Sequence, residues 1–234
     1  MTGTLINVGT VLAGTLIGVL VGSRLPGGIQ QRVLAGLGLV TLVLGIDNAL
    51  EWRHTSPLIV FGAVLLGGIT GELVGIERRL ERLGDLAQRR LASGRAHSRV
   101  SEGFVTASLL FCVGPLTVVG SIQDGLTGDS ATLVSKALLD GFAAIAFAST
   151  LGWGVGLSAI TVLLVQGGIA LGAGAFEHIL SEGSEALAAL VSTGGILIIG
   201  ISLKLLGVKD VKVGNFLPAL VFAPALVGLV GLVS

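Results

Sequence analysis

The sequence has few of the residues on which soluble domains and disulfide-linked scaffolds depend. Only 12% of its 234 residues are charged and 4% are aromatic, whereas soluble domains carry roughly 25% charged residues. Cys112 is the only cysteine, which excludes an internal disulfide framework and a thiolate metal site. The three histidines, His54, His97 and His178, show no metal-ligand spacing. We therefore expect no metal centre and no cofactor.

Motifs of hydrolytic enzymes are also missing. The chain has no Gly-x-Ser-x-Gly, no His-Glu-x-x-His and no histidine inside an apolar segment, so we expect no enzyme. A nucleic-acid partner is not expected either. The basic residues cluster in one segment, where they alternate with acidic residues and are not interleaved with aromatic ones.

Apolar residues dominate instead: 52% of the chain is hydrophobic and the mean hydropathy is +0.96. A helix needs roughly 20 apolar residues to cross the hydrocarbon of a lipid bilayer. By this criterion the chain is an all-α integral membrane protein with about eight transmembrane helices, and seven is the alternative count. The predicted spans are residues 3–22, 30–50, 57–75, 103–121, 130–150, 153–174, 186–206 and 215–233.

The distribution of basic residues between these spans predicts the orientation, because cytoplasmic loops are enriched in Lys and Arg. With both termini external, Arg53 is the only basic residue in an outer loop. The inner side then receives Arg24, Arg32, the seven arginines between residues 78 and 99, Lys204, Lys209 and Lys212. Residues 76–100 are therefore a cytoplasmic segment, and the apolar residues of 76–91 recur at the steps of an amphipathic helix. This helix either binds anionic lipid or packs on its neighbours.

The 38 glycines include two series at four-residue spacing, one at Gly14, Gly18 and Gly22 and the other at Gly67, Gly71 and Gly75. Small-residue faces let transmembrane helices approach closely. They serve either tight packing within the chain or the contact of a homo-oligomer.

An internal repeat is indicated by three short matches. Residues 14–18 match 168–172, 42–46 match 197–201, and 58–61 match 219–222, at offsets of 154, 155 and 161 residues. Because five spans precede the sixth, the second copy would be inverted in the membrane, as in many secondary transporters. The single transmembrane domain, 1–234, would comprise repeat one (1–75), the cytoplasmic segment, a central hairpin (101–150) and repeat two (151–234). Chance similarity among apolar strings is the alternative.

The central hairpin carries the polar residues that are least expected in hydrocarbon. Gly114 and Pro115 predict a kink or break in the fourth span. Lys136 and Asp140 lie four residues apart in the fifth span, so they share one face and can neutralise each other. Charged residues inside a membrane are costly and usually mark a substrate, ion or proton site, although a structural ion pair is the alternative. The outer part of the hairpin adds Ser121, Gln123 and Asp124, and weaker candidates elsewhere are Asn7, Asp47, Asn48 and Glu72.

Several of these strings together are similar to one known family. They are residues 3–7 (Gly-Thr-Leu-Ile-Asn), Gly71-Glu72 with Ile76-Glu77-Arg78, residues 111–125, and 136–141 followed by Phe147-Ala-Ser. Over essentially its whole length the chain resembles the YqgA/YdfK-like bacterial inner-membrane proteins, a family of unknown function. The resemblance implies a multi-pass protein of the bacterial plasma membrane, of a kind described as a candidate transporter, without naming a substrate.

These observations favour a small transporter or channel for an ion or small polar solute. The rival hypothesis is a non-transporting sensor or assembly partner that binds lipid or another membrane protein. A solvated cavity that reaches Asp140 would favour transport, whereas a dry Lys136–Asp140 contact would favour the rival.

Overall fold

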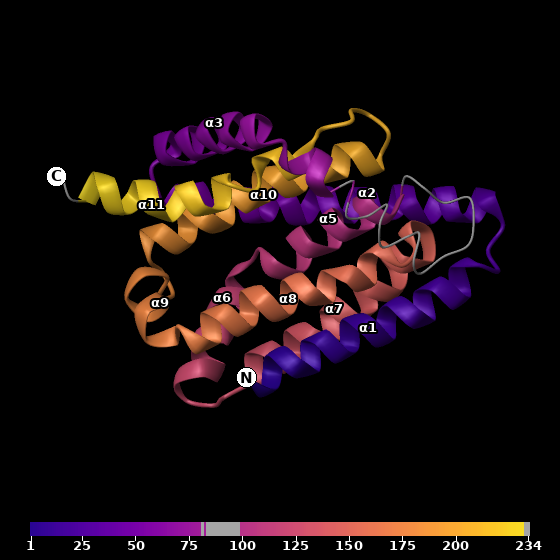
Figure 1. Cartoon of the computed structure of the whole chain (residues 1–234), viewed down its shortest axis with the longest axis horizontal. Coiled ribbons are helices and arrows are strands. Elements are labelled where there is room, and N and C mark those ends of the chain that lie inside the picture. Colours follow the sequence, from indigo (N-terminus) through magenta and orange to yellow (C-terminus); the bar gives the residue numbers. More distant parts are fainter. Residues whose placement is uncertain (81, 83–98, 232–234) are drawn as a thin grey trace.

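The computed structural model describes residues 1–80, 82 and 99–231, and in that part every regular element is a helix (Figure 1). The α-helices are α1 (Thr2–Gly22), α2 (Gly27–Ala49), α3 (Pro57–Val74), α5 (Arg99–Cys112), α6 (Pro115–Leu126), α7 (Ala131–Leu151), α8 (Gly154–Leu171), α9 (Ala173–Ile179), α10 (Glu185–Leu205) and α11 (Ala219–Gly231). Two 3₁₀ helices, η1 (Leu50–His54) and η2 (Val213–Phe216), join them.

The predicted all-α membrane architecture is confirmed. Among the described residues, seven helical segments are long and apolar enough to cross a bilayer. The α5–α6 pair passes the same test together but is bent by 62°, so it makes an eighth span if the pair crosses as one broken helix. The spans fall where hydropathy placed them, because length and apolar content are properties of the local sequence alone.

Both ends of the described chain lie toward the same end of the bundle (Figure 1). The start of α1, the α6–α7 corner, α9 and the end of α11 gather there, and we call this the outer end. The α1–α2 connection lies at the opposite, inner end. The arrangement agrees with an even number of spans. Which of the two ends faces outward stays a prediction from the distribution of basic residues.

Glycines set the helix contacts. A Cβ built on Gly14, Gly18 or Gly22 would collide with the backbone carbonyl oxygen of Gly141, Ile145 or Ser149 of α7, respectively. On α3, Gly67 and Gly71 face Ala219 and Asn215 in the same way, whereas Gly75, with φ 69°, ends the helix as its C-cap. These small-residue faces therefore serve packing within the chain. A homo-oligomer remains a prediction that would need other surfaces.

The helices that the repeat would relate are also neighbours, since α1 packs on α8, α2 on α10 and α3 on α11. Whether the two triplets superpose stays a prediction.

Of the predicted amphipathic helix, residues 76–80 and 82 are helical, and its other residues lie outside the described part. The most buried of the apolar helices is α10: 72% of its most apolar 18-residue stretch is buried, against 17% for the α2 segment.

Candidate functional site

Lys136 and Asp140 form the predicted ion pair on one face of α7. Both side chains are more than nine-tenths buried. Asn7 of α1 donates a hydrogen bond from Nδ2 to Oδ2 of Asp140 at 2.9 Å. The carboxylate therefore has a second partner besides Lys136, and this partner lies more than 130 residues away in sequence. The structure thus brings three of the candidate residues together.

The local sequence explains how α1 reaches the pair. A Cβ on Gly3 would clash with the side chain of Leu133, and the Gly14 position lies against Gly141, directly beside Asp140. With side chains at these glycines, α1 could not approach α7 closely enough for the short Asn7 amide to reach the carboxylate. The glycine series of α1 therefore positions Asn7.

Asp124 is held at the start of α1. Its Oδ2 accepts a hydrogen bond from the backbone N–H of Gly3 at 3.1 Å and lies 2.9 Å from the amino group of Met1. A carboxylate is favourable there because the first N–H groups of a helix have no partner within the helix and carry partial positive charge. Asp124 is 3% exposed, and its other oxygen, Oδ1, has no hydrogen-bond partner.

Further buried polar groups without partners lie on the helices that carry these residues or pack on them. Thr4 of α1, Ser121 of α6 and Gln166 of α8 are fully buried, and their side-chain oxygen and nitrogen atoms make no hydrogen bond. Each unsatisfied group costs about 1–3 kcal/mol of folding free energy. We call the set Thr4, Asn7, Ser121, Asp124, Lys136, Asp140 and Gln166 the polar interior; it is contributed by α1, α6, α7 and α8, which pack on one another.

Gln166 was missed by sequence reasoning, although a signal was present. It interrupts the apolar run of residues 159–165, and an amide in such a run is as unexpected in hydrocarbon as the candidates that were chosen. Its burial depends on which face of α8 meets α1 and α6, which hydropathy does not reveal.

Other candidates lie away from the pair. Gln123 accepts a hydrogen bond from the Thr132 hydroxyl at 2.9 Å and ties the α6–α7 corner together. Asp47 is exposed and Asn48 half-buried near the outer end of α2. At the inner end, Glu72 accepts a hydrogen bond from Asn215 Nδ2 at 2.5 Å.

A second junction that sequence reasoning missed surrounds Asn215. The N–H of Glu77 donates to Asn215 Oδ1 at 2.8 Å, and the N–H of Gly214 donates to Glu77 Oε2 at 2.7 Å. Together with the contact to Glu72, these bonds fasten the inner end of α3 to η2. The role of this junction is structural, since each of its groups has a partner.

The predicted helix break is confirmed at Gly114 and Pro115. Gly114 has φ 153° and ψ 152°, a conformation that is open essentially to glycine alone. The carbonyl of Phe111, which the break deprives of its helical partner, accepts a hydrogen bond from the Thr117 hydroxyl at 3.0 Å. The fourth span therefore changes direction beside the polar interior.

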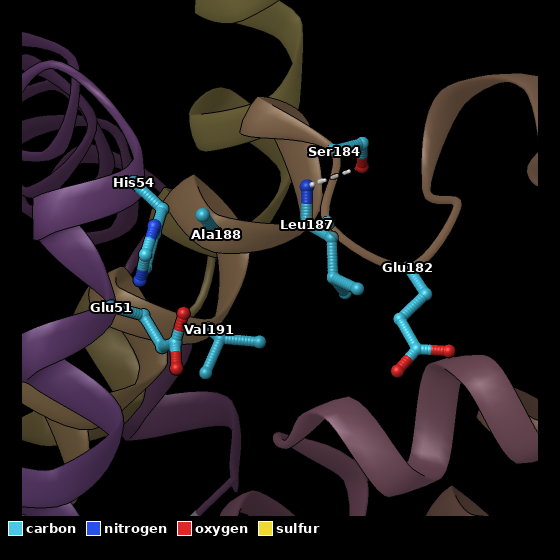
Figure 2. Close-up of a pocket in the computed structure, with 8 residues that line it drawn as sticks. Glu51, His54, Glu182, Ser184, Leu187, Ala188 and Val191 are labelled. Atoms are coloured by element: carbon cyan, nitrogen blue, oxygen red, sulfur yellow. Dashed lines mark hydrogen bonds between the residues drawn. The ribbon is translucent and has the colours of Figure 1, made fainter.

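Three cavities are relevant to access. The outer cavity, about 340 Å³, lies between η1, the turn before α10, and α10 itself (Figure 2). The inner cavity, about 220 Å³, is lined mainly by apolar residues of α5, α8 and α11, and a smaller one of about 20 Å³ lies beside Glu102 and Lys204. None of the three is lined by Lys136 or Asp140. Cys112 lines the inner cavity, however, and lies within the electrostatic range of both charges.

Comparison with known proteins assigns the family. The family model described as "Protein of unknown function (DUF554)" matches residues 2–228. The chain belongs to this family. It is 30% identical over 229 residues to "Uncharacterized membrane protein YdfK" of Bacillus subtilis (strain 168), a match that covers 97% of this chain and 96% of the relative. It is also 30% identical over 224 residues to "Uncharacterized protein YqgA" of Escherichia coli (strain K12), with 94% of each chain covered. No solved structure matches the chain. The resemblance seen in the sequence is thereby confirmed, and the chain is a multi-pass membrane protein.

Proposed function

We propose that the protein is a small transporter or channel for an ion or small polar solute, rather than an enzyme. It would act in the bacterial plasma membrane with both termini outside. The observation that carries the proposal is the polar interior: a buried ion pair and several unpartnered buried polar groups lie on four helices that pack on one another. Such groups are costly in a membrane and are generally retained for a task.

The chemistry follows from the pair. Lys136 neutralises Asp140, so no net charge is buried while the site holds no solute. A cation that approaches Asp140 can replace the ammonium group, and the unpartnered oxygens of Thr4, Asn7 and Ser121 are of the kind that coordinates a desolvated cation. Displacement of Lys136 would then give the protein two states with different charge arrangements, which a transport cycle requires.

A second candidate function is favoured by one specific observation. The Lys136–Asp140 contact is buried and paired, and none of the three cavities described above is lined by either residue. A structural ion pair in a sensor or assembly partner has this appearance. The two hypotheses make different predictions for variants of the pair.

The test uses purified protein in proteoliposomes, with influx of K⁺, Na⁺ and H⁺ measured separately by ion-sensitive dyes. Under the transport proposal, Asp140→Asn retains its fold and loses influx, and Glu177→Gln, an exposed carboxylate at the outer end, keeps influx at the wild-type level. Under the rival, Asp140→Asn leaves Lys136 uncompensated and unfolds easily, with a loss of about 3–5 kcal/mol. If Asp140→Asn combined with Lys136→Met is both stable and fully active, the pair is structural and the proposal is wrong.

A further inference from the structure

Two cavities approach the contact between α5 and α10 from different sides, and the small third cavity lies at the inner part of this contact. The outer cavity is lined on α10 by Leu187, Ala188 and Val191. The inner cavity is lined on α5 by residues between Phe104 and Val113. The small cavity near the inner end shares Val105 with the inner cavity and is bordered by Lys204 of α10. The outer cavity has lining residues on α10 but none on α5, and the inner cavity has lining residues on α5 but none on α10. The two therefore approach each other where α5 packs on α10.

A single layer of side chains separates the outer cavity from the inner one. Val191 lines the outer cavity, and Gly194 is the next residue on the same face of α10. A Cβ built on Gly194 would collide with Cγ1 of Val113, so the two residues are in close contact. Val113 in turn lines the inner cavity and is 7% exposed. The barrier is therefore the Val113 side chain against the bare backbone of Gly194.

Val113 also lies next to the bend between α5 and α6. It is the residue before Gly114, and its N–H still bonds to the carbonyl of Leu109 at 2.9 Å, whereas α6 begins two residues later at 62° to α5. A rotation about the Gly114 backbone would change the angle between α5 and α6, and with it the packing around Val113. Cys112, its other neighbour, also lines the inner cavity.

The lining of the outer cavity indicates the charge of the solute. Among the described residues, Glu51, His54 and Glu182 are its ionisable residues, and neither Lys nor Arg lines it. Figure 2 shows Glu51 and His54 on one wall and Glu182 on the other. A cavity with carboxylates on opposite walls and low-dielectric surroundings raises the local concentration of cations.

We propose that the outer and inner cavities, which approach each other at the α5–α10 contact, belong to one path for small cations, closed in this structure by Val113 against Gly194. This inference rests on the proposed transport function and names its route and the class of solute. Closure by a single apolar side chain is a hydrophobic constriction of the kind that gates channels by excluding water. Opening requires only that Val113 leave Gly194.

Thiol accessibility tests the path without knowledge of the transported solute. In a Cys112→Ala background, Leu187→Cys places a thiol in the outer cavity and Leu217→Cys places one in the inner cavity. The probe is an impermeant trimethylammonium methanethiosulfonate, applied to one side of the membrane at a time. We expect Leu187→Cys to react from the outer side alone and Leu217→Cys from the inner side alone. A sulfonate reagent of similar size should react more slowly than the cationic one at Leu187→Cys.

The gate is tested by removing the two methyl groups of Val113 and then adding one methyl group at Gly194. Val113→Ala should let the outer reagent reach Leu217→Cys at least about tenfold faster, a factor that corresponds to about 1.36 kcal/mol of barrier. Gly194→Ala added to Val113→Ala refills the gap and should return the rate toward its original value. Gly168→Ala is the matched control, because a Cβ at this exposed position of α8 meets nothing within 4 Å.

Each outcome decides the inference. If Leu187→Cys is unreactive from the outer side, or Val113→Ala leaves the outer reactivity of Leu217→Cys unchanged, the path is wrong. If the accessibility pattern is found but the wild-type protein conducts none of the three test ions, the path stands and the proposed function is wrong. Ion flux with no change in accessibility would support transport by another route and refute this one.

Discussion

Close contact between α1 and α7 holds the polar interior together, and it can be tested with two glycine variants of the same helix. Gly18→Ala places a Cβ against the backbone oxygen of Ile145 and 2.8 Å from Cβ of Ala148. Neither atom belongs to a flexible side chain, so the new methyl group can be accommodated only if the helices separate. Gly9→Ala adds the same methyl group at an exposed position of α1 where nothing lies within 4 Å.

The expected difference between the two variants follows from two opposed effects. Both gain helix propensity, about 0.8–1.0 kcal/mol for Gly→Ala in a helix interior. Only Gly18→Ala is overpacked, which costs typically about 1–3 kcal/mol and more where the backbone must move. We therefore expect Gly18→Ala to be less stable than Gly9→Ala by about 1–3 kcal/mol. Gly9→Ala should be equal to the wild type or slightly more stable.

The assay is thermal unfolding of each purified variant in the same detergent and lipid mixture, followed by circular dichroism. The comparison of two Gly→Ala changes in one helix cancels the propensity gain, so the difference reports the α1–α7 contact alone. Separation of the helices should also break the Asn7–Asp140 hydrogen bond, so Gly18→Ala should lower any influx that depends on Asp140. Equal melting temperatures for the two variants would refute the packing described here.

Three further predictions concern topology, symmetry and the unpartnered amide. An impermeant thiol reagent on intact cells should label a cysteine at position 182 but not one at 212, and the reverse result would invert the orientation. In an experimental structure, the helices α1–α3 should superpose on α8, α10 and α11 after a rotation of about 180° about an axis in the membrane plane, and unrelated packing would show that the matched strings are coincidence. Gln166→Leu should raise the stability by about 1–3 kcal/mol, because it removes a buried amide without partners. The same variant should lower influx if the amide contacts the solute, and a stable variant with full influx would remove Gln166 from the site.

The sequence was sufficient for the features that depend on single segments. The spans follow from local apolar content, the break from Gly114 and Pro115, and the ion pair from a four-residue spacing on one helix. Each of these is decided by residues near one another in the chain, so no knowledge of packing is needed.

The sequence was insufficient for contacts between segments. Asn7 meets Asp140, and Asp124 meets the N–H of Gly3, only because the glycine face of α1 lies against α7 and the end of α6 reaches the start of α1. Hydropathy ranks Asn7 no higher than Asp47, yet the first is buried and the second is exposed. What separates them is which face of each helix is covered, and that is a property of the assembled bundle.

The broken span connects the two functional inferences. On the α5 side of the break, Cys112 and Val113 line the inner cavity, and on the α6 side, Ser121 and Asp124 belong to the polar interior. The α1–α7 contact is locked by glycines and backbone atoms. At the break, by contrast, a Cβ at Gly114 would meet nothing within 4 Å, and the Thr117–Phe111 hydrogen bond spans the two helices. We therefore expect this part of the bundle to move more readily at the break than at α1 or α7. A rotation there would shift Val113 away from Gly194 and move Ser121 and Asp124 relative to Asp140 in the same step, so the gate and the ion pair would change together.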